Sequence, residues 1–189
     1  NKLQNTFKSV NQSKITATTI TKYIGYLEDA FLIEAANRYD IRGKSYIGTP
    51  VKYYFMDMGL RNSRINFRQM EVTHSMENVI YNELRMRGFR VDVGNLSITE
   101  PGKDGRAVKK QLEVDFICNK GSKRYYIQSA YKLGTEEKVS QEIRPFLKIH
   151  DSFKKIVITS DTPRPFYRDE GILMMNVYDF LLMPDSLEL

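Results

Sequence analysis

The sequence predicts a mixed α/β fold, with a small helix-and-ribbon unit first and a mixed sheet flanked by helices after it. Three observations support this: an amphipathic helix followed by two strand-like runs within the first 58 residues, a β-hairpin pattern over 109–131, and alternating helical and strand patterns from residue 73 onward. The 189 residues, 41% hydrophobic and 28% charged, are enough for one large globular domain or two small ones.

The first predicted helix begins at residue 18, and Thr18 or Thr19 is its expected N-cap. Its apolar residues recur at steps of three and four; they are Ile20, Tyr23, Ile24, Leu27 and Phe31. Two predicted strands follow, at 31–35 and 51–57, joined by a polar, basic turn that contains glycine. A helix followed by such a ribbon is typical of the end of a winged helix, and residues before 14 would be the end of its preceding helix.

The segment GLRNSRINFRQME (59–71) has no clear period, so we expect it to connect two domains. The predicted boundary lies near residue 66, which gives a winged-helix module at 1–66 and a second domain at 67–189.

The second domain begins with a predicted helix at 73–87, with Thr73 as its N-cap and Gly88 as its stop. Further strands are predicted at 89–93, 96–98, 109–118, 123–131, 154–161 and from 171, with helices at 135–149 and just before 182. The order α-β-β-β-α-β-β-α indicates a mixed sheet with helices on its faces.

Composition argues against several classes of protein. The most apolar segment, 171–183, is interrupted by polar residues and is too short to span a membrane, and the N-terminal residues lack the apolar core of a signal peptide. Cys118 is the only cysteine, so neither an intrachain disulfide nor a cysteine zinc site can form. His74 and His150 lie far apart in the sequence and are expected to be structural or surface residues. We therefore expect a cytoplasmic protein.

The net charge of +6 is concentrated in the N-terminal third. Residues 1–66 carry ten Lys and Arg against five Asp and Glu, whereas the remainder carries nineteen against eighteen. A basic excess of this kind is typical of a surface that binds a polyanion, and it favours nucleic acid as a partner.

Four residues carry the candidate chemistry of the second domain. Asp115 and Gln128 are expected on adjacent hairpin strands, Glu77 on a helix beside them, and Lys132 on the same strand as Gln128. Carboxylates held a few ångströms apart bind Mg²⁺, and a lysine orients or activates the attacking water. Glu77, Asp115, Gln128 and Lys132 are therefore the candidate catalytic residues, with Glu77 and Asp115 as weak Mg²⁺ ligands.

These motifs, HSMENVIYNELRMRGFRVDVG, LEVDFI and YYIQSAYKL, resemble the restriction-endonuclease-like, PD-(D/E)xK type of fold. Joined to ATTITKYIGYLEDAFLIEAANRYDIRGKSYIGTPVKYYFMDMGLRN, they resemble the C-terminal region of a prokaryotic group of AAA-type ATPases that end in a domain of unknown function. The resemblance covers nearly the whole chain. It implies that an ATP-binding core of the same protein precedes this region and is its partner.

The chain departs from the nuclease pattern at two positions. The pattern has an acid at 128 and a lysine at 130, where this sequence has Gln128 and Ala130. Lys132 could substitute from the same strand face, as could Lys109 or Lys110 from the neighbouring strand. Because glutamine binds Mg²⁺ poorly and alanine cannot activate water, we expect the nuclease-like domain to be inactive. The alternative is that Asp115 is a solvated strand residue in a fold kept for binding or assembly.

Three functional hypotheses follow. In the first, the region binds nucleic acid through the winged helix, by Thr19, Lys22 and Tyr26 of the helix and Arg42 and Lys44 of the turn, and the second domain does not cut. In the second, it is a protein-interaction or oligomerisation region that regulates the ATPase. In the third, it is a Mg²⁺-dependent nuclease whose lysine has migrated.

Overall fold

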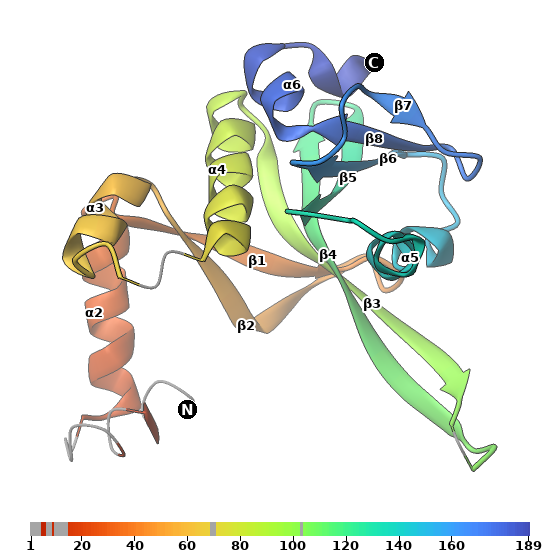
Figure 1. Ribbon diagram of the computed structural model, residues 1–189. Coiled ribbons are helices and arrows are strands. Elements are labelled where there is room, and N and C mark those ends of the chain that lie inside the picture. Colours follow the sequence, from red (N-terminus) through yellow and green to blue (C-terminus); the bar gives the residue numbers. More distant parts are fainter. Residues whose placement is uncertain (1–4, 7–8, 10–14, 69–70, 103) are drawn as a thin grey trace.

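The computed structural model describes residues 5, 6, 9, 15–68, 71–102 and 104–189. Its strands belong to one eight-stranded mixed sheet in the order β2-β1-β3-β4-β5-β6-β8-β7, flanked by helices, as the sequence predicts (Figure 1). The strands are β1 (Ile33–Asp40), β2 (Ser45–Phe55), β3 (Arg90–Pro101), β4 (Ala107–Lys120), β5 (Lys123–Ala130), β6 (Lys154–Thr159), β7 (Phe166–Tyr167) and β8 (Ile172–Asn176). The helices are α2 (Ala17–Asp29), α3 (Met58–Arg64), α4 (Val72–Met86), α5 (Glu136–Ile143) and α6 (Val177–Leu182), with short 3-10 turns at Phe146–Lys148 and Ser186–Glu188.

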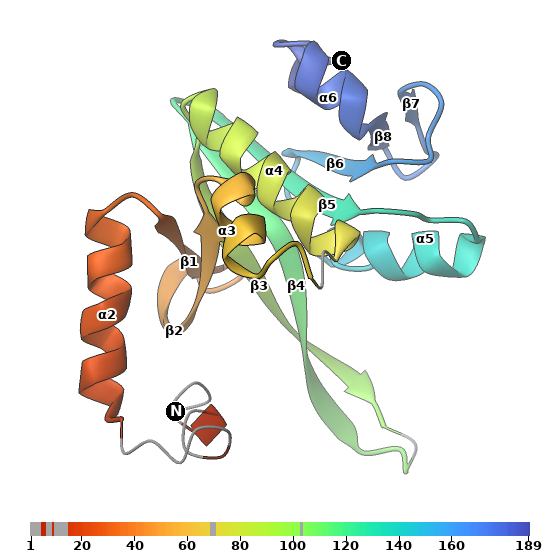
Figure 2. The same ribbon diagram turned by 60° about the vertical axis from the view of Figure 1, so that its left-hand side comes forward.

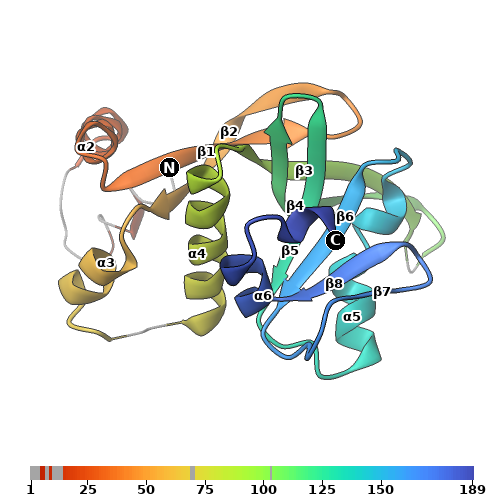
Figure 3. The same cartoon turned by 90° about the horizontal axis from the view of Figure 1, so that it is seen from above.

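The two faces of the sheet are covered by different helices (Figure 3). Helices α4 and α6 pack with the first core cluster, which includes Ile80, Leu84 and Phe180. Helix α5 packs with the second, through Val139 and Ile143. Among the described residues, no helix has both the length and the apolar character that a membrane crossing needs.

The predicted helix and ribbon of the N-terminal unit are present as α2, β1 and β2, but the ribbon does not stand apart from the second unit. Strand β1 pairs parallel with β3, with Arg38 opposite Val93 and Asp40 opposite Asn95, so the sheet runs across the predicted boundary near residue 66. Helix α2 projects from the edge of the sheet formed by β2 and β1, and it has no buried residue (Figure 2). The winged helix therefore remains a prediction, and most of its remnant before residue 14 lies outside the described residues.

The structure corrects two of the predicted N-caps and adds one helix that was not predicted. Thr16, and neither Thr18 nor Thr19, is the N-cap of α2, because its hydroxyl accepts the Thr19 N–H at 3.1 Å. Residues 58–64 form α3, which the sequence pattern missed; Asp57 caps it by accepting the Leu60 N–H at 3.0 Å. Helix α4 begins one residue earlier than predicted, so the N-cap position falls on Glu71 and Thr73 lies inside the helix.

The hairpin predicted from the sequence is confirmed, and its first strand, β4, has a β-bulge in its pairing with β3 on the other side. Strands β4 and β5 pair antiparallel, with Phe116 opposite Ile127. Against β3, the register shifts between Asp92 and Gly94, so that Asp115 and Phe116 together face the single residue Val93. Such a β-bulge re-aims side chains locally. The bulge allows the consecutive residues Asp115 and Phe116 both to lie toward the face of the sheet that α4 covers.

The bulge requires a glycine on the neighbouring strand. A Cβ added to Gly94 would lie 2.8 Å from the Cβ of Val114, which is fully buried. Gly94 therefore permits the close approach of β3 to β4 beside Asp115.

We predict that Gly94→Ala lowers the free energy of unfolding by about 1–3 kcal/mol, because the extra methyl group overpacks this junction. Gly48→Ala is the matched control, since an added Cβ at Gly48 in β2 meets nothing within 4 Å. Urea unfolding followed by circular dichroism measures both variants. Equal stabilities of the two variants would contradict the role given to Gly94.

Candidate functional site

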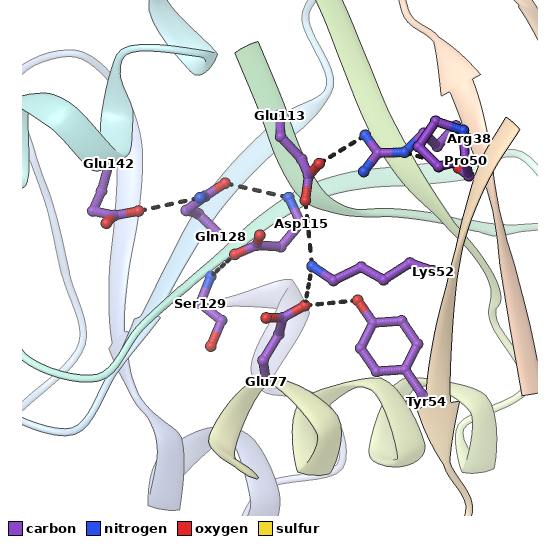
Figure 4. Close-up of polar contacts among 10 residues, drawn as sticks. All are labelled: Arg38, Pro50, Lys52, Tyr54, Glu77, Glu113, Asp115, Gln128, Ser129 and Glu142. Carbon is purple, nitrogen blue, oxygen red and sulfur yellow. Dashed lines mark hydrogen bonds and ion pairs between the residues drawn. The ribbon is translucent and has the colours of Figure 1, made fainter. Parts of the chain in front are cut away.

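Three of the predicted site residues converge beside the bulge (Figure 4). Glu77 comes from α4, Asp115 from β4 and Gln128 from the adjacent strand β5. The Gln128 side-chain Oε1 accepts the Asp115 backbone N–H at 3.3 Å, and the Asp115 Oδ2 accepts the Ser129 backbone N–H at 2.8 Å. Asp115 is only 9% exposed, so the alternative of a solvated strand residue is wrong.

A lysine lies in this cluster, but it comes from β2, where a strand was predicted at 51–57 without any site residue assigned to it. The Lys52 Nζ of β2 lies 2.5 Å from the Glu77 Oε1 and 3.3 Å from the Glu113 Oε1. The Tyr54 hydroxyl, two residues along the same strand, donates to the same Glu77 oxygen at 2.7 Å. The signal was present in the sequence: Lys52 interrupts an apolar run and shares a strand face with an aromatic residue.

The lysines proposed from the sequence lie elsewhere. Strand β5 ends at Ala130, so Lys132 is not on the strand of Gln128 as predicted; it is exposed and its Nζ lies 5.6 Å from the Tyr131 ring centroid. Lys110 pairs with Glu100 at 3.0 Å on the β3–β4 hairpin, and Lys109 is exposed beside it. In the described part of the chain, none of these lysines contacts Glu77 or Asp115.

The outer part of the cluster is an ion-pair chain that links it to β1. Arg38 contacts the Glu113 Oε2 at 2.7 Å and donates to the Pro50 carbonyl at 3.0 Å, while Glu113 also pairs with Lys52. Burial alone would lower the pKa of Lys52, but Glu77, Asp115 and Glu113 outweigh it and raise the pKa above its usual value. Lys52 is therefore a permanent cation in this site.

Asp115 has the most perturbed carboxyl of the cluster. Burial raises its pKa to about 7, and the nearby charge of Glu77 adds to the effect, against the Ser129 N–H and Lys52, which lower it. A carboxyl that is desolvated and coupled to a charged neighbour is characteristic of functional sites. Near neutral pH, Asp115 exchanges a proton readily, so any cation that binds there competes with that proton.

On the α5 side, Gln128 is held by a second acid that the sequence analysis missed. Its Nε2 donates to the Glu142 Oε2 at 3.1 Å, and burial raises the pKa of Glu142. With the Oε1 facing the Asp115 N–H, both ends of the Gln128 amide are fixed. Within the described residues, the Ser129 Oγ is buried without a hydrogen-bond partner beside this network.

The donor set can hold Mg²⁺ through Glu77 and Asp115. In the ranges that the structure describes, no three His, Cys, Asp or Glu residues are grouped as metal ligands. Mg²⁺ commonly uses only one or two carboxylates and keeps several waters. The Glu77 Oε2 and the Asp115 Oδ1 accept no hydrogen bond from the described residues, so one oxygen of each carboxylate remains for a cation.

The five candidate nucleic-acid contacts lie in two separate groups. On α2, the Thr19 hydroxyl bonds with that of Thr16, and the Lys22 Nζ lies 5.7 Å from the Tyr26 ring centroid. At the β1–β2 turn, Arg42 donates to the Ser97 carbonyl and Lys44 is exposed. Strand β1, about 25 Å long at roughly 3.3 Å per residue, lies between the helix that carries the first group and the turn that carries the second.

We predict that the stability of the wild-type chain falls relative to Asp115→Asn as pH rises, in a chelator and without metal. A raised carboxyl pKa means that the folded state holds a proton that the unfolded state has already lost, so stability falls as pH rises from about 4 to about 7. Between pH 5 and pH 8 the difference should change by about 2–3 kcal/mol.

Urea unfolding at several pH values measures this difference. Asp169→Asn, at an exposed position, is the control and should track the wild type. Parallel curves for wild type and Asp115→Asn would contradict the raised pKa.

Comparison with known proteins gives relatives without an assigned activity. A family model described as a domain of unknown function (DUF8612) matches residues 2–71. An uncharacterized protein of Haemophilus influenzae is 35% identical over 187 residues, covering 92% of this chain and 42% of that protein. An uncharacterized protein of Methanocaldococcus jannaschii is 30% identical over 184 residues, covering 94% and 36%.

Among solved structures, protein VC1899 from Vibrio cholerae aligns with a TM-score of 0.38 at 10% identity, over 96% of this chain and 47% of that one, a similarity too low to assign a fold. The chain thus spans less than half the length of the curated relatives that it matches, and it is similar to uncharacterized proteins of a bacterium and an archaeon.

Proposed function

We propose that this chain acts on nucleic acid as part of a larger protein, and that the cluster around Glu77 and Asp115 hydrolyses phosphodiester bonds with Mg²⁺. The observation behind the proposal is the Lys52 Nζ, 2.5 Å from Glu77. The expectation of an inactive domain rested in part on Ala130, and Lys52 supplies from β2 the lysine that position 130 lacks. The hypothesis of a nuclease with a migrated lysine is therefore favoured over binding alone.

Each residue of the cluster would have a separate role in this reaction. Glu77 and Asp115 would hold the cation through their free carboxylate oxygens. Bound Mg²⁺ lowers the pKa of water and neutralises phosphate charge. Lys52 stays protonated because its pKa is raised, so it stabilises negative charge on the phosphate and does not act as a base. Gln128 and Glu142 fix the strand that carries Asp115.

The wider setting is also a proposal. The basic excess in residues 1–66 supports nucleic acid as the polyanion. The resemblance to the C-terminal region of AAA-type ATPases supports an ATP-binding partner region in the same protein, and the relatives are more than twice as long as the part that this chain matches. ATP hydrolysis there would then control access to or movement along the nucleic acid.

We predict slow, Mg²⁺-dependent cleavage of single-stranded or duplex DNA or RNA, measured on labelled oligonucleotides in gels. Lys52→Ala and Asp115→Asn should each lower the rate by about 10²–10³, the usual cost of removing a group that stabilises transition-state charge. Lys132→Ala is the matched lysine control and should stay within about twofold.

Chelation should abolish cleavage. Equal cleavage by wild type and Asp115→Asn would identify a contaminating nuclease as the source of the activity. Absence of cleavage with both Mg²⁺ and Mn²⁺ would contradict the hydrolytic proposal and favour the binding-only hypothesis.

One observation favours a second function, that of an interaction or oligomerisation region. Helix α2 has no buried residue, and its apolar side continues into Phe31, which is 83% exposed. Phe31 also adopts a left-handed backbone conformation, with φ of 54°. Together with Ile33 and Met56, it lines a pocket of about 310 Å³ at the junction of α2, β1 and α4. Exposed apolar surface of this kind marks protein contacts.

For this second function we predict concentration-dependent dimerisation, measured by analytical ultracentrifugation. Phe31→Glu should raise the dissociation constant of the dimer at least tenfold, which corresponds to about 1.4 kcal/mol. The reason is that the substitution places a charge in the apolar contact. Leu182→Glu, at an 80% exposed residue of α6, is the control and should leave association unchanged. A monomer at all concentrations would rule out self-association through α2.

A further inference from the structure

A pocket of about 200 Å³ lies beside the cluster, bounded by β2, α3 and the first turns of α4. Its lining consists of Lys52, Tyr53, Tyr54, Phe55, Met58, Arg61, His74, Glu77 and Asn78. Lys52 and Glu77 belong to both the lining and the carboxylate–lysine cluster (Figure 4). Whatever enters this pocket therefore lies next to the proposed reactive site.

Arg61 is held in place within the lining but its charge is not neutralised. Its guanidinium carbon lies 6.0 Å from the Phe55 ring centroid, and its Nη1 donates to the neutral Asn62 Oδ1 at 3.0 Å. In the described part of the chain it forms no ion pair; Asp57, the nearest acid in sequence, caps α3 by accepting the Leu60 N–H. Arg38, on the other side of the cluster, is paired with a carboxylate.

Among the described residues that line the pocket, Glu77 is the only carboxylate, and Lys52 neutralises it at 2.5 Å. The pocket therefore carries an excess positive charge from Arg61, whose planar guanidinium keeps most of its N–H groups free. Such a guanidinium suits a phosphate oxygen pair, since Arg binds phosphate with two parallel hydrogen bonds. The volume is roughly that of six or seven waters, which leaves room for a phosphate with part of its sugar.

We infer that this pocket binds a phosphate group of the substrate strand next to the phosphate at the Glu77–Asp115 cluster, with Arg61 as its anchor. This inference rests on the proposed function for the nature of the substrate. Arg61 acts as a binding and positioning residue: it fixes where the strand lies, so that the neighbouring phosphate meets Lys52. His74, on the first turns of α4, stands at the exposed rim, where its Nδ1 contacts Glu71 at 2.6 Å.

The test is binding without cleavage. Fluorescence anisotropy of a labelled single-stranded oligonucleotide, with and without a 5′-phosphate, is measured in chelator across a salt series. We expect Arg61→Ala to weaken binding about tenfold and to reduce the salt slope by roughly 0.7, the value for one lost contact to a single strand. Arg61→Lys should recover only part of the loss, because it keeps the charge and loses the fork.

Arg64→Ala is the matched control, because Arg64 lies on the same helix but outside the pocket; it should stay within about twofold. Circular dichroism of Arg61→Ala checks the fold, and Arg61→Lys retains the packing on Phe55 should the alanine variant unfold. Competition by inorganic phosphate separates recognition of a phosphate alone from recognition of a strand: the inference requires the oligonucleotide to compete at far lower concentration.

Equal affinities of the Arg61→Ala and Arg64→Ala variants would overturn the inference, as would the absence of oligonucleotide binding at low salt. Because no metal is present, these outcomes are independent of the cleavage test. Loss of binding in Arg61→Ala together with no cleavage by wild type would support the phosphate pocket and reject the hydrolytic site.

Discussion

The contact between Lys52 and Glu77 joins three parts of the molecule that the sequence presents separately. It connects β2, at the edge of the sheet, with α4, which covers one of its faces, and through Glu113 it reaches β4. Forming this ion pair costs free energy, because both charges lose hydration. Their attraction offsets that cost only if the geometry and the remaining hydrogen bonds are good. The Tyr54 hydroxyl on Glu77 provides one of those bonds.

The aromatic packing under this ion pair makes its geometry rigid. The Tyr54 ring stacks on that of Tyr81 with centroids 4.0 Å apart, and both rings lie close to Phe116. All three residues are buried in the first core cluster. Because Phe116 shares the bulge with Asp115, core packing and the position of the reactive carboxyl depend on the same two residues of β4.

The charge balance of the site explains how a neutral glutamine is tolerated at position 128. An acid there would add a further negative charge beside Asp115, whose pKa is already raised by burial and by Glu77. Gln128 instead ties the Asp115 backbone to Glu142 without adding charge. Lys52 and Arg38 offset the acids that remain, so the cluster combines exchangeable protons with fixed cations.

The sequence by itself determined most of the secondary elements and their order, because hydrophobic periodicity and turn residues are local; helix α3 was the element it missed. It located the hairpin that joins Asp115 and Gln128, since the strands on either side of a short turn must pair. It also placed Glu77 on a helix. That this helix packs beside the hairpin was an assumption, which the tertiary structure supports.

The tertiary structure decided which lysine completes the cluster and that the ribbon belongs to the main sheet. Lys52 lies 63 residues before Asp115, and no local pattern relates them. They meet only because β1 pairs with β3, which carries β2 and its lysine to the face that α4 covers. The lysine expected near position 130 lies elsewhere for the same reason: strand alternation predicts neighbours along a strand, whereas the Lys52 contact depends on the order of strands across the sheet.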